Sequence, residues 1–240
     1  MKHERIALVL GLAAGLLAVF LRLLFPGDLA ENLVALGQLD RVRFYERVVA
    51  QDGWAEVVGF VFGVAGVYLA AKGRVLNYPI GIVNVLTYAY VFWHVRLYAD
   101  STLQIVYFAM LVAGWRAWLH GGPESTPLPV SRAPRRTLLW LGLAVVVFTA
   151  LLTPVLTAVG GARPLIDTAT AVGSLACQYL LNRKHIENWL GWMAVNVVYI
   201  PLYISRGLAA TAVLYAVFLV LAVVGWREWS AKLNPEAAKV

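Results

Sequence analysis

The sequence has few charged residues and a single cysteine. Only 14% of its 240 residues are charged and 61% are hydrophobic, whereas soluble domains hold about 25% charged and about 45–50% apolar residues. With a mean hydropathy of +0.72, this excludes intrinsic disorder, collagen-like chains, coiled coils and ordinary soluble enzymes. Cys177 alone cannot form a disulfide framework or a cysteine-based metal site. Because it lies in an apolar run, we expect a packed thiol rather than a reactive one.

Motifs of catalysis and nucleotide binding are absent from the sequence. It contains no GxxxxGK[ST] phosphate loop, no GxSxG or HExxH motif and no Cys/His ligand spacing. No Asp or Glu lies clearly in the middle of an apolar run, where a proton relay or a sodium site would need one. We therefore expect no enzyme, no cofactor and no metal. An intramembrane enzyme and a purely structural membrane protein are the alternatives from other functional classes.

Long apolar segments dominate the sequence. A membrane core of about 30 Å needs about 20 apolar residues for each helical crossing. Segment 6–25 has a basic start like that of a signal peptide, but its apolar run exceeds the roughly 7–15 residues of a cleavable one. We interpret it as a retained N-terminal helix. In all, the sequence predicts an all-α integral membrane protein with eight spans, at 6–25, 54–71, 78–95, 101–119, 137–158, 165–181, 189–205 and 208–229.

Two of these stretches of chain repeat each other. Residues 56–118 and 167–229 align without gaps at an offset of 111 residues, and both end in Gly-Trp-Arg-x-Trp. Each unit contains three predicted spans, and the single span 137–158 between them gives both units the same orientation in the membrane. The sequence therefore predicts a 3+1+3 arrangement of parallel repeats, a design known from SWEET transporters.

The predicted organisation has five parts. Residues 27–52 mix charged and apolar residues, which predicts an amphipathic helix on the membrane surface, although a solvated helix fits almost as well. Residues 120–136 are rich in Pro and Gly and predict an irregular linker. The parts are an N-terminal helix plus amphipathic segment (1–53), a first three-helix repeat (54–119), a linker and connecting helix (120–163), a second three-helix repeat (164–230) and a tail (231–240).

The distribution of Lys and Arg predicts the orientation. With eight spans, one side of the membrane holds both termini and thirteen of the twenty basic residues. The short loops opposite hold only Arg96, Arg163 and Arg206, and four more basic residues flank or occupy the amphipathic stretch. Because basic loops stay on the cytoplasmic side, we expect both termini in the cytoplasm.

Span 189–205 carries a polar and aromatic face. Trp189, Trp192, Asn196, Tyr199 and Tyr203 recur at spacings of three and four, which places them on one side of a helix. Packing or an interfacial belt explains aromatic residues well, but an amide as deep as that of Asn196 costs free energy in hydrocarbon unless it is paired. Pro201 in the same span predicts a bend that can act as a hinge, whereas Pro79 either bends its span or simply starts it.

Other predicted spans add candidate binding residues. A neutral path of amides and aromatic rings suits an uncharged or singly cationic solute, because Trp and Tyr faces attract cations. The acidic residues Glu56, Asp100 and Asp167 lie at span starts, where a capping role is the simpler interpretation. The predicted substrate-binding residues are Trp189, Trp192, Asn196, Gln178, Asn84, Tyr88, Gln104 and Tyr215.

At this point the sequence resembles a known family. Two segments resemble the PnuC-type vitamin transporters: NRKHIENWLGWMAVNVVYIPLYISRGLAATAVLYAVFLVLAVVGWREW and YPIGIVNVLTYAYVFWHVRLYADSTLQIVYFAMLVAGWRAW. The likeness extends over about 54–230. The Trp-x-x-Trp of Trp189 and Trp192, followed by Asn196, is similar to the family's signature for nicotinamide riboside.

The resemblance implies a fold, a function and partners. These are a SWEET-like 3+1+3 fold, facilitated diffusion of nicotinamide riboside (an NAD precursor) across the inner membrane, trapping by a cytoplasmic kinase that phosphorylates the riboside, and a homotrimer. Since related members carry other vitamins, a thiamine or other vitamin carrier is the alternative.

Overall fold

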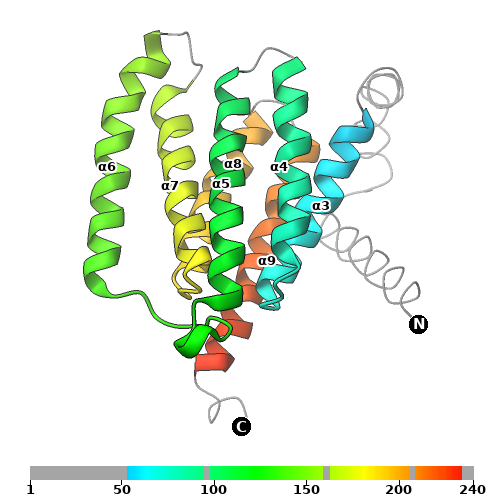
Figure 1. Cartoon of the computed structure of the whole chain (residues 1–240). Helices are drawn as coiled ribbons and strands as arrows, with labels where there is room; N and C mark the ends of the chain where they lie inside the picture. The colour runs from blue at the N-terminus through cyan, green and yellow to red at the C-terminus, as the bar shows by residue number, and fades with distance from the viewer. Residues whose placement is uncertain (1–52, 95–97, 159–162, 206–208, 234–240) are drawn as a thin grey trace, which may run out of the picture. The chain divides into compact units, whose positions relative to one another are not determined.

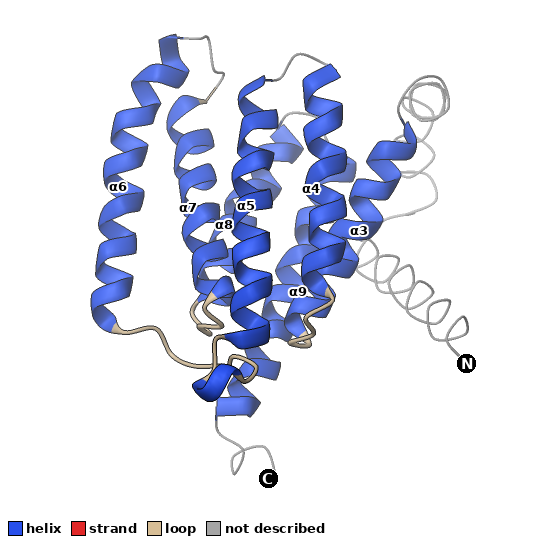
Figure 2. Cartoon of the chain, viewed as in Figure 1, coloured by secondary structure: helices blue, strands red, loops and turns tan. Residues whose placement is uncertain are grey.

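The computed structural model describes residues 53–94, 98–158, 163–205 and 209–233. These residues form α-helices and one short 3-10 helix, and no strand occurs among them (Figure 2). Seven of the predicted spans are thereby confirmed as helices, whereas span 6–25 and the amphipathic stretch 27–52 lie outside the described residues. The helices are α3 (Gly53–Ala71), α4 (Asn77–His94), α5 (Tyr98–His120), η1 (Pro123–Ser125), α6 (Arg135–Ala158), α7 (Pro164–Asn182), α8 (Asn188–Ser205) and α9 (Ala209–Leu233).

The described residues from position 58 onward form one compact unit. Within it α4 packs against α5, α6 against α7, and α8 against both α7 and α9. The two predicted repeats meet where α5 packs against α7. Figure 1 shows α6, the predicted connecting helix, beside α7 and on the outside of the unit.

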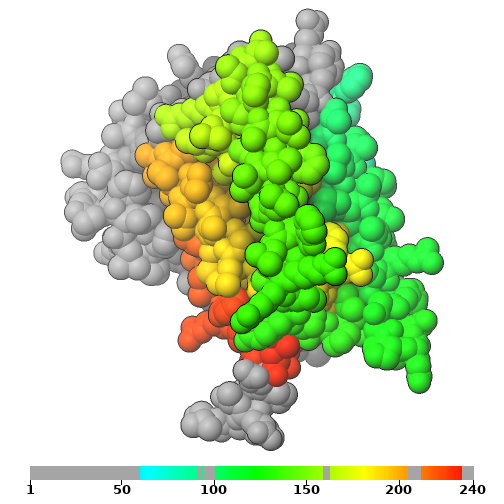
Figure 3. Space-filling model, turned by 90° about the vertical axis from the view of Figure 1, so that its left-hand side faces the viewer, coloured from blue at the N-terminus to red at the C-terminus, as the bar shows by residue number. Residues whose placement is uncertain are grey.

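The outer surface of this unit is apolar. Leu139 and Val146 of α6 are 74% and 66% exposed, and α6 runs down the face that Figure 3 turns to the viewer. By length and composition, residues 101–120, 135–158 and 212–233 can each cross a membrane, and 60–71 is a shorter apolar helix. Large apolar side chains on the outside are what a hydrocarbon environment favours and water does not.

The first helix of each predicted repeat ends in the same way. The N–H of Gly73 donates to the Ala70 carbonyl, as the N–H of Lys184 donates to that of Leu181. Both Gly73 (φ +70°) and Lys184 (φ +52°) are left-handed. The next N–H in each turn also bonds back to the helix: that of Arg74 donates to the Leu69 carbonyl and that of His185 donates to the Leu180 carbonyl. Each helix end therefore forms the two hydrogen bonds of a Schellman motif. Glycine adopts this conformation without steric cost, whereas lysine does not.

The second helix of each predicted repeat also begins in the same way. The side-chain amide of Asn77 donates to the Arg74 carbonyl at 2.7 Å, and that of Asn188 donates to the His185 carbonyl at 2.6 Å. Each Asn is thus held by the turn that it follows. These paired turns, 111 residues apart, support the repeat predicted from the sequence.

Four aromatic side chains form the centre of the buried core. The rings of Tyr78 and Trp118 are 5.1 Å apart and nearly perpendicular (85°), and those of Trp189 and Trp229 are 5.4 Å apart at 86°. Trp118 and Trp229 meet each other at 5.9 Å. All four side chains are at most 1% exposed. We call Tyr78, Trp118, Trp189 and Trp229 the aromatic cluster.

The glycines of the two Gly-Trp-Arg-x-Trp endings make room for this cluster. A Cβ atom on Gly114 would lie 2.6 Å from Cε1 of Tyr78, and one on Gly225 would lie 2.5 Å from Cε2 of Trp189. Both distances are shorter than the closest approach of two non-bonded carbon atoms. The glycine of the motif therefore lets one ring lie directly against the third helix of each repeat.

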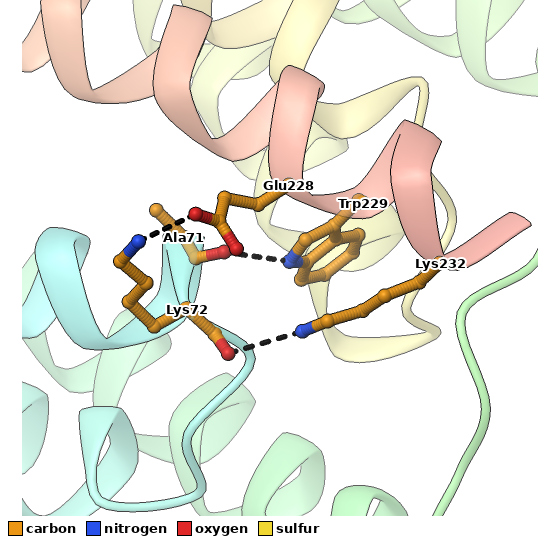
Figure 4. A network of polar contacts seen from close by, with 5 residues as sticks. All are labelled: Ala71, Lys72, Glu228, Trp229 and Lys232. Carbon is orange, nitrogen blue, oxygen red and sulfur yellow. Dashed lines mark hydrogen bonds and ion pairs between the residues drawn. The ribbon is translucent and has the colours of Figure 1, made fainter. Parts of the chain in front are cut away.

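The last tryptophan of each ending bonds to the opposite repeat. Trp118 Nε1–H donates to the Leu181 carbonyl at 3.1 Å. Trp229 Nε1–H donates to the Ala71 carbonyl, also at 3.1 Å (Figure 4). Carbonyls in the last turn of a helix have no partner within the helix. Each repeat therefore supplies a buried donor to the end of the other repeat's first helix.

The predicted linker is irregular but well held. The Ser131 N–H donates to the Lys184 carbonyl, its own carbonyl accepts from the Ile186 N–H, and its hydroxyl lies 3.0 Å from Nδ1 of His185. The Ala133 N–H donates to the Glu187 carboxylate at 2.8 Å. The linker is therefore attached to the turn between α7 and α8.

Two prolines differ in their position. Pro79 is the third residue of α4, where its missing N–H would have had no helical partner. It therefore starts its helix, the simpler of the two interpretations. Pro201 lies inside α8, so it removes a helical hydrogen bond there.

Candidate functional site

The structure places the predicted substrate residues on five helices, α4, α5, α7, α8 and α9. The tryptophans of the Trp-x-x-Trp motif lie in the first turns of α8, next to the turn between α7 and α8. Trp189 belongs to the aromatic cluster, and Trp192 is partly buried against the hydrophobic core that contains this cluster. The Trp189 indole N–H has no hydrogen-bond partner among the described residues. Such a donor costs free energy while it is unpaired, and a polar group of a bound molecule would relieve that cost.

Two of the predicted residues are buried amides. Asn196 of α8 is 3% exposed and Gln178 of α7 is 6% exposed. Gln178 Nε2 donates to Oδ1 of Asn182 at 2.9 Å, and Asn182 Nδ2 donates to the Met110 carbonyl at 2.7 Å. The hydrogen bond to Asn182 therefore holds the Gln178 amide in place.

Asn182 is a polar residue that the sequence reasoning missed. It joins α7 to α5 through Met110 and also accepts a hydrogen bond from the Tyr78 hydroxyl at 3.3 Å. It lies four residues after Gln178, on the same helical face. That spacing was the available signal, but the position near the predicted helix end concealed its role.

Asn84 lies where three helices approach one another. A Cβ atom on Gly63 of α3 would be 3.5 Å from both Asn84 Nδ2 and Phe218 Cζ of α9. Gly63 thus allows the Asn84 amide to lie between α3, α4 and α9. Tyr88 follows one turn later on the same helix and is half-buried, which places it on the Asn84 face.

A group of three tyrosines lies further from the aromatic cluster along α8 and α9. Tyr199 and Tyr203 stack at 5.5 Å with an angle of 28°, and the Tyr215 ring lies 4.6 Å from Tyr199 and 5.0 Å from Tyr203. We call these residues the tyrosine cluster. Of them, Tyr215 was predicted as a binding residue, and Tyr199 and Tyr203 were placed on the polar and aromatic face of α8.

Hydroxyl groups of α5 and α7 meet the tyrosine cluster. The Ser174 side chain lies close to the hydroxyl groups of Tyr107 and Tyr199, and the Thr170 side chain lies close to that of Tyr199. Ser174 Oγ in turn donates to the Thr170 carbonyl at 2.8 Å. Gln104 is half-buried one turn before Tyr107. The structure therefore brings α5, α7, α8 and α9 together around hydroxyl groups and aromatic rings.

The arrangement is suited to binding rather than to bond-breaking chemistry. Amides and hydroxyls can hydrogen-bond a sugar or a carboxamide, and the rings can stack on a flat, cationic heterocycle. Among the described residues, no group of three His, Cys, Asp or Glu could hold a metal ion. The residues present thus offer a neutral environment with aromatic and hydrogen-bonding partners.

Comparison with known proteins points to the same class of molecule. The family model for the nicotinamide mononucleotide transporter matches residues 53–231. The nicotinamide riboside transporter PnuC of Escherichia coli is 29% identical over 206 residues, covering 73% of this chain and 84% of that protein. The riboflavin/roseoflavin transporter RibM of Streptomyces davaonensis is 24% identical over 181 residues, covering 73% and 84%.

A solved structure is similar as well. The crystal structure of the vitamin B3 transporter PnuC aligns with a TM-score of 0.63 and 27% identity, covering 91% of this chain and 98% of that one. The PnuC-type resemblance seen in the sequence is thereby confirmed, and with it a multi-pass membrane protein from a transporter family rather than an enzyme family. The chain belongs to the nicotinamide mononucleotide transporter family.

Proposed function

We propose that this protein carries nicotinamide riboside across the membrane by facilitated diffusion. The observation that carries the proposal is that Asn196 of α8 and Gln178 of α7 are only 3% and 6% exposed inside an otherwise apolar bundle. We infer that these amides line a polar path between the repeats. Buried amides are costly unless they serve a partner. PnuC relatives are named for nicotinamide riboside, whose pyridinium ring and ribose match stacking and hydrogen-bonding groups.

Within that path we assign roles to the predicted residues. Trp192, with Trp189, stacks against or edges the pyridinium ring. Asn196, Gln178 and Asn84 hydrogen-bond the ribose or the carboxamide. The remaining half-buried residues line the route on the far side of these amides: Tyr88, Gln104 and Tyr215.

The proposed architecture is a SWEET-like 3+1+3 fold with the five parts predicted from the sequence. Support comes from the matching Schellman ends at Gly73 and Lys184 and from the reciprocal tryptophan hydrogen bonds. In this arrangement α3–α5 and α7–α9 are the two parallel units and α6 connects them. Rocking one unit against the other opens the path to one side of the membrane at a time.

The cellular setting follows from charge and family. Both termini, and the end of the helix bundle that holds the aromatic cluster, face the cytoplasm, because the Lys and Arg residues gather on that side. We assign the protein to the inner membrane. Net uptake then requires a cytoplasmic kinase that phosphorylates the riboside, and the protein works as a homotrimer; both of these rest on the family resemblance.

The test uses purified protein in liposomes. Labelled nicotinamide riboside is expected to enter until inside and outside concentrations are equal, with or without a proton or sodium gradient. Excess unlabelled riboside should compete more strongly than thiamine or riboflavin. Stronger competition by riboflavin or thiamine would instead favour a carrier for that vitamin, in line with the RibM relative. Accumulation driven by either gradient would contradict the uncoupled mechanism.

A further inference from the structure

A charged cleft lies at the end of α3, outside the substrate path. Its volume is ≈ 620 Å³, and it is lined by two residues of the last turns of α3, Tyr68 and Leu69, together with Lys72, Gly73, Arg74, Glu228 and Lys232. We call it the α3–α9 cleft. Its size falls within the range of about 300–1,000 Å³ that is typical of small-molecule sites. It has no part in the stacking and amide contacts assigned to nicotinamide riboside.

The charges of this cleft are not balanced. Three cationic side chains, Lys72, Arg74 and Lys232, share it with the single carboxylate of Glu228. That carboxylate is already paired, since Lys72 Nζ contacts Glu228 Oε1 at 2.5 Å (Figure 4). The charges of Arg74 and Lys232 therefore have no acidic counterpart among the residues that line the cleft.

The two remaining cations have hydrogen-bond donors to spare. Lys232 Nζ donates to the Lys72 carbonyl at 3.1 Å, which uses one of its three N–H groups. Arg74 is exposed, and its guanidinium makes no hydrogen bond or ion pair with the described part of the chain. Guanidinium and ammonium groups are both common binders of phosphate oxygens.

A fourth cation adds to the positive potential nearby. Lys184 is only 8% exposed, and its ammonium lies 4.3 Å from the centre of the Trp118 ring. Burial, and after it the positive charge of Lys232, lowers the pKa of Lys184. Lys184 and Lys232 therefore repel each other, and a bound anion would reduce that repulsion.

We propose that the α3–α9 cleft binds a phosphate group, held by Arg74 and Lys232 beside the Lys72–Glu228 ion pair. Two sources share this chemistry: a soluble phosphate monoester or the headgroup of an anionic phospholipid. Lys72 stays with Glu228, while Arg74 supplies a planar pair of donors and Lys232 a second positive charge. The site needs neither the riboside path nor transport, so it stands or falls independently of the proposed function.

The experiment measures thermal stabilisation of the full chain in neutral detergent at constant ionic strength. Inorganic phosphate and adenosine monophosphate are titrated against chloride, and short-chain phosphatidylglycerol is titrated against phosphatidylcholine. We expect either the soluble phosphates (inorganic phosphate and adenosine monophosphate) or phosphatidylglycerol to raise the midpoint of unfolding until the effect saturates. Whichever of these two groups saturates at the lower concentration identifies the source of the phosphate group. Arg74→Gln should weaken this binding about fivefold, because one partly exposed charge pair is lost.

Arg227→Gln is the matched control. Arg227 is an exposed arginine of α9 that does not line the cleft, so the substitution removes the same charge without touching the site. If Arg74→Gln fails to fold, Lys232→Gln replaces it with the same expectation. Equal weakening in the control and in the cleft variants would overturn the proposal, as would stabilisation by neither phosphate source beyond chloride or phosphatidylcholine.

Discussion

Tyr78 and Trp189 lie 111 residues apart and make the same contact in the two halves of the molecule. Each ring lies nearly perpendicular to the last tryptophan of its own repeat, with centroid distances of 5.1 Å to Trp118 and 5.4 Å to Trp229. Perpendicular pairs of this kind add about 0.5–1.5 kcal/mol beyond the area that they bury. The repeated Gly-Trp-Arg-x-Trp ending is therefore first of all a packing motif, which joins the two repeats at one end of the bundle.

Gly225→Ala should destabilise the protein. The new Cβ would lie 2.5 Å from the Trp189 ring, and overpacking of this kind costs about 1–3 kcal/mol. The midpoint of thermal unfolding in detergent measures the effect. Gly142→Ala in α6 is the control, because nothing lies within 4 Å of its Cβ position. Equal midpoints for the two variants would contradict the packing role of Gly225.

Trp192→Ala should weaken the binding of nicotinamide riboside about 10- to 100-fold, because stacking on an aromatic side chain contributes about 1–3 kcal/mol. Isothermal titration calorimetry on purified protein measures the affinity. Trp140→Ala is the control, because it removes a side chain of the same size that is 60% exposed on the outer side of α6. The affinity of this variant for nicotinamide riboside should equal that of the wild type. A folded Trp192→Ala variant with unchanged affinity would remove Trp192 from the substrate site.

Pro201→Ala should slow uptake and leave equilibrium binding largely intact. Proline inside α8 removes a helical hydrogen bond and permits a bend, and alanine restores a stiffer helix. Initial uptake rates in liposomes, measured beside affinity, separate the two effects. Pro154→Ala makes the same change within α6, outside the proposed moving units, and should transport normally. Wild-type rates in both variants would place the hinge elsewhere.

The stability of the protein should fall when the pH is lowered through the titration range of His185. Burial is the main cause that lowers the His185 pKa below its usual 6.5; the Arg183 charge lowers it further, and Glu187 opposes both. Because the unfolded chain then binds a proton at higher pH than the folded one, acid favours unfolding below about pH 6.5. The loss of thermal stability between about pH 7.5 and 5 should be smaller in His185→Gln than in the wild type. An identical loss in both proteins would assign the pH dependence to other groups.

Much of the fold could be predicted from the sequence because bilayer thickness sets the length of each apolar run. The helices at 135–158 and 164–182 begin and end within a few residues of the predicted spans, since polar linkers and prolines mark their limits. The repeat was equally visible, because the two endings share four residues at constant spacing. Family membership followed from the same segments.

What the sequence could not reveal is which helical face meets which neighbour. The 3.6-residue period placed Trp189, Trp192 and Asn196 on one helical face. Only the tertiary structure showed that the Trp189 ring packs against Trp229 and that its indole N–H has no hydrogen-bond partner among the described residues. The same holds for Asn182, whose hydrogen bond to Met110 spans 72 residues of chain. Periodicity carries no information about such pairs.

The sequence by itself thus determined the membrane class, the approximate limits of the seven described α-helices, the internal repeat and the family, because all of these depend on local composition and spacing. The tertiary structure alone decided the crossed tryptophan hydrogen bonds and the α3–α9 cleft. Trp229 reaches Ala71 across 158 residues, and Lys72 reaches Glu228 across 156. Contacts at such separations depend on how the helices pack, and packing depends on the combined shape of many side chains rather than on any one segment.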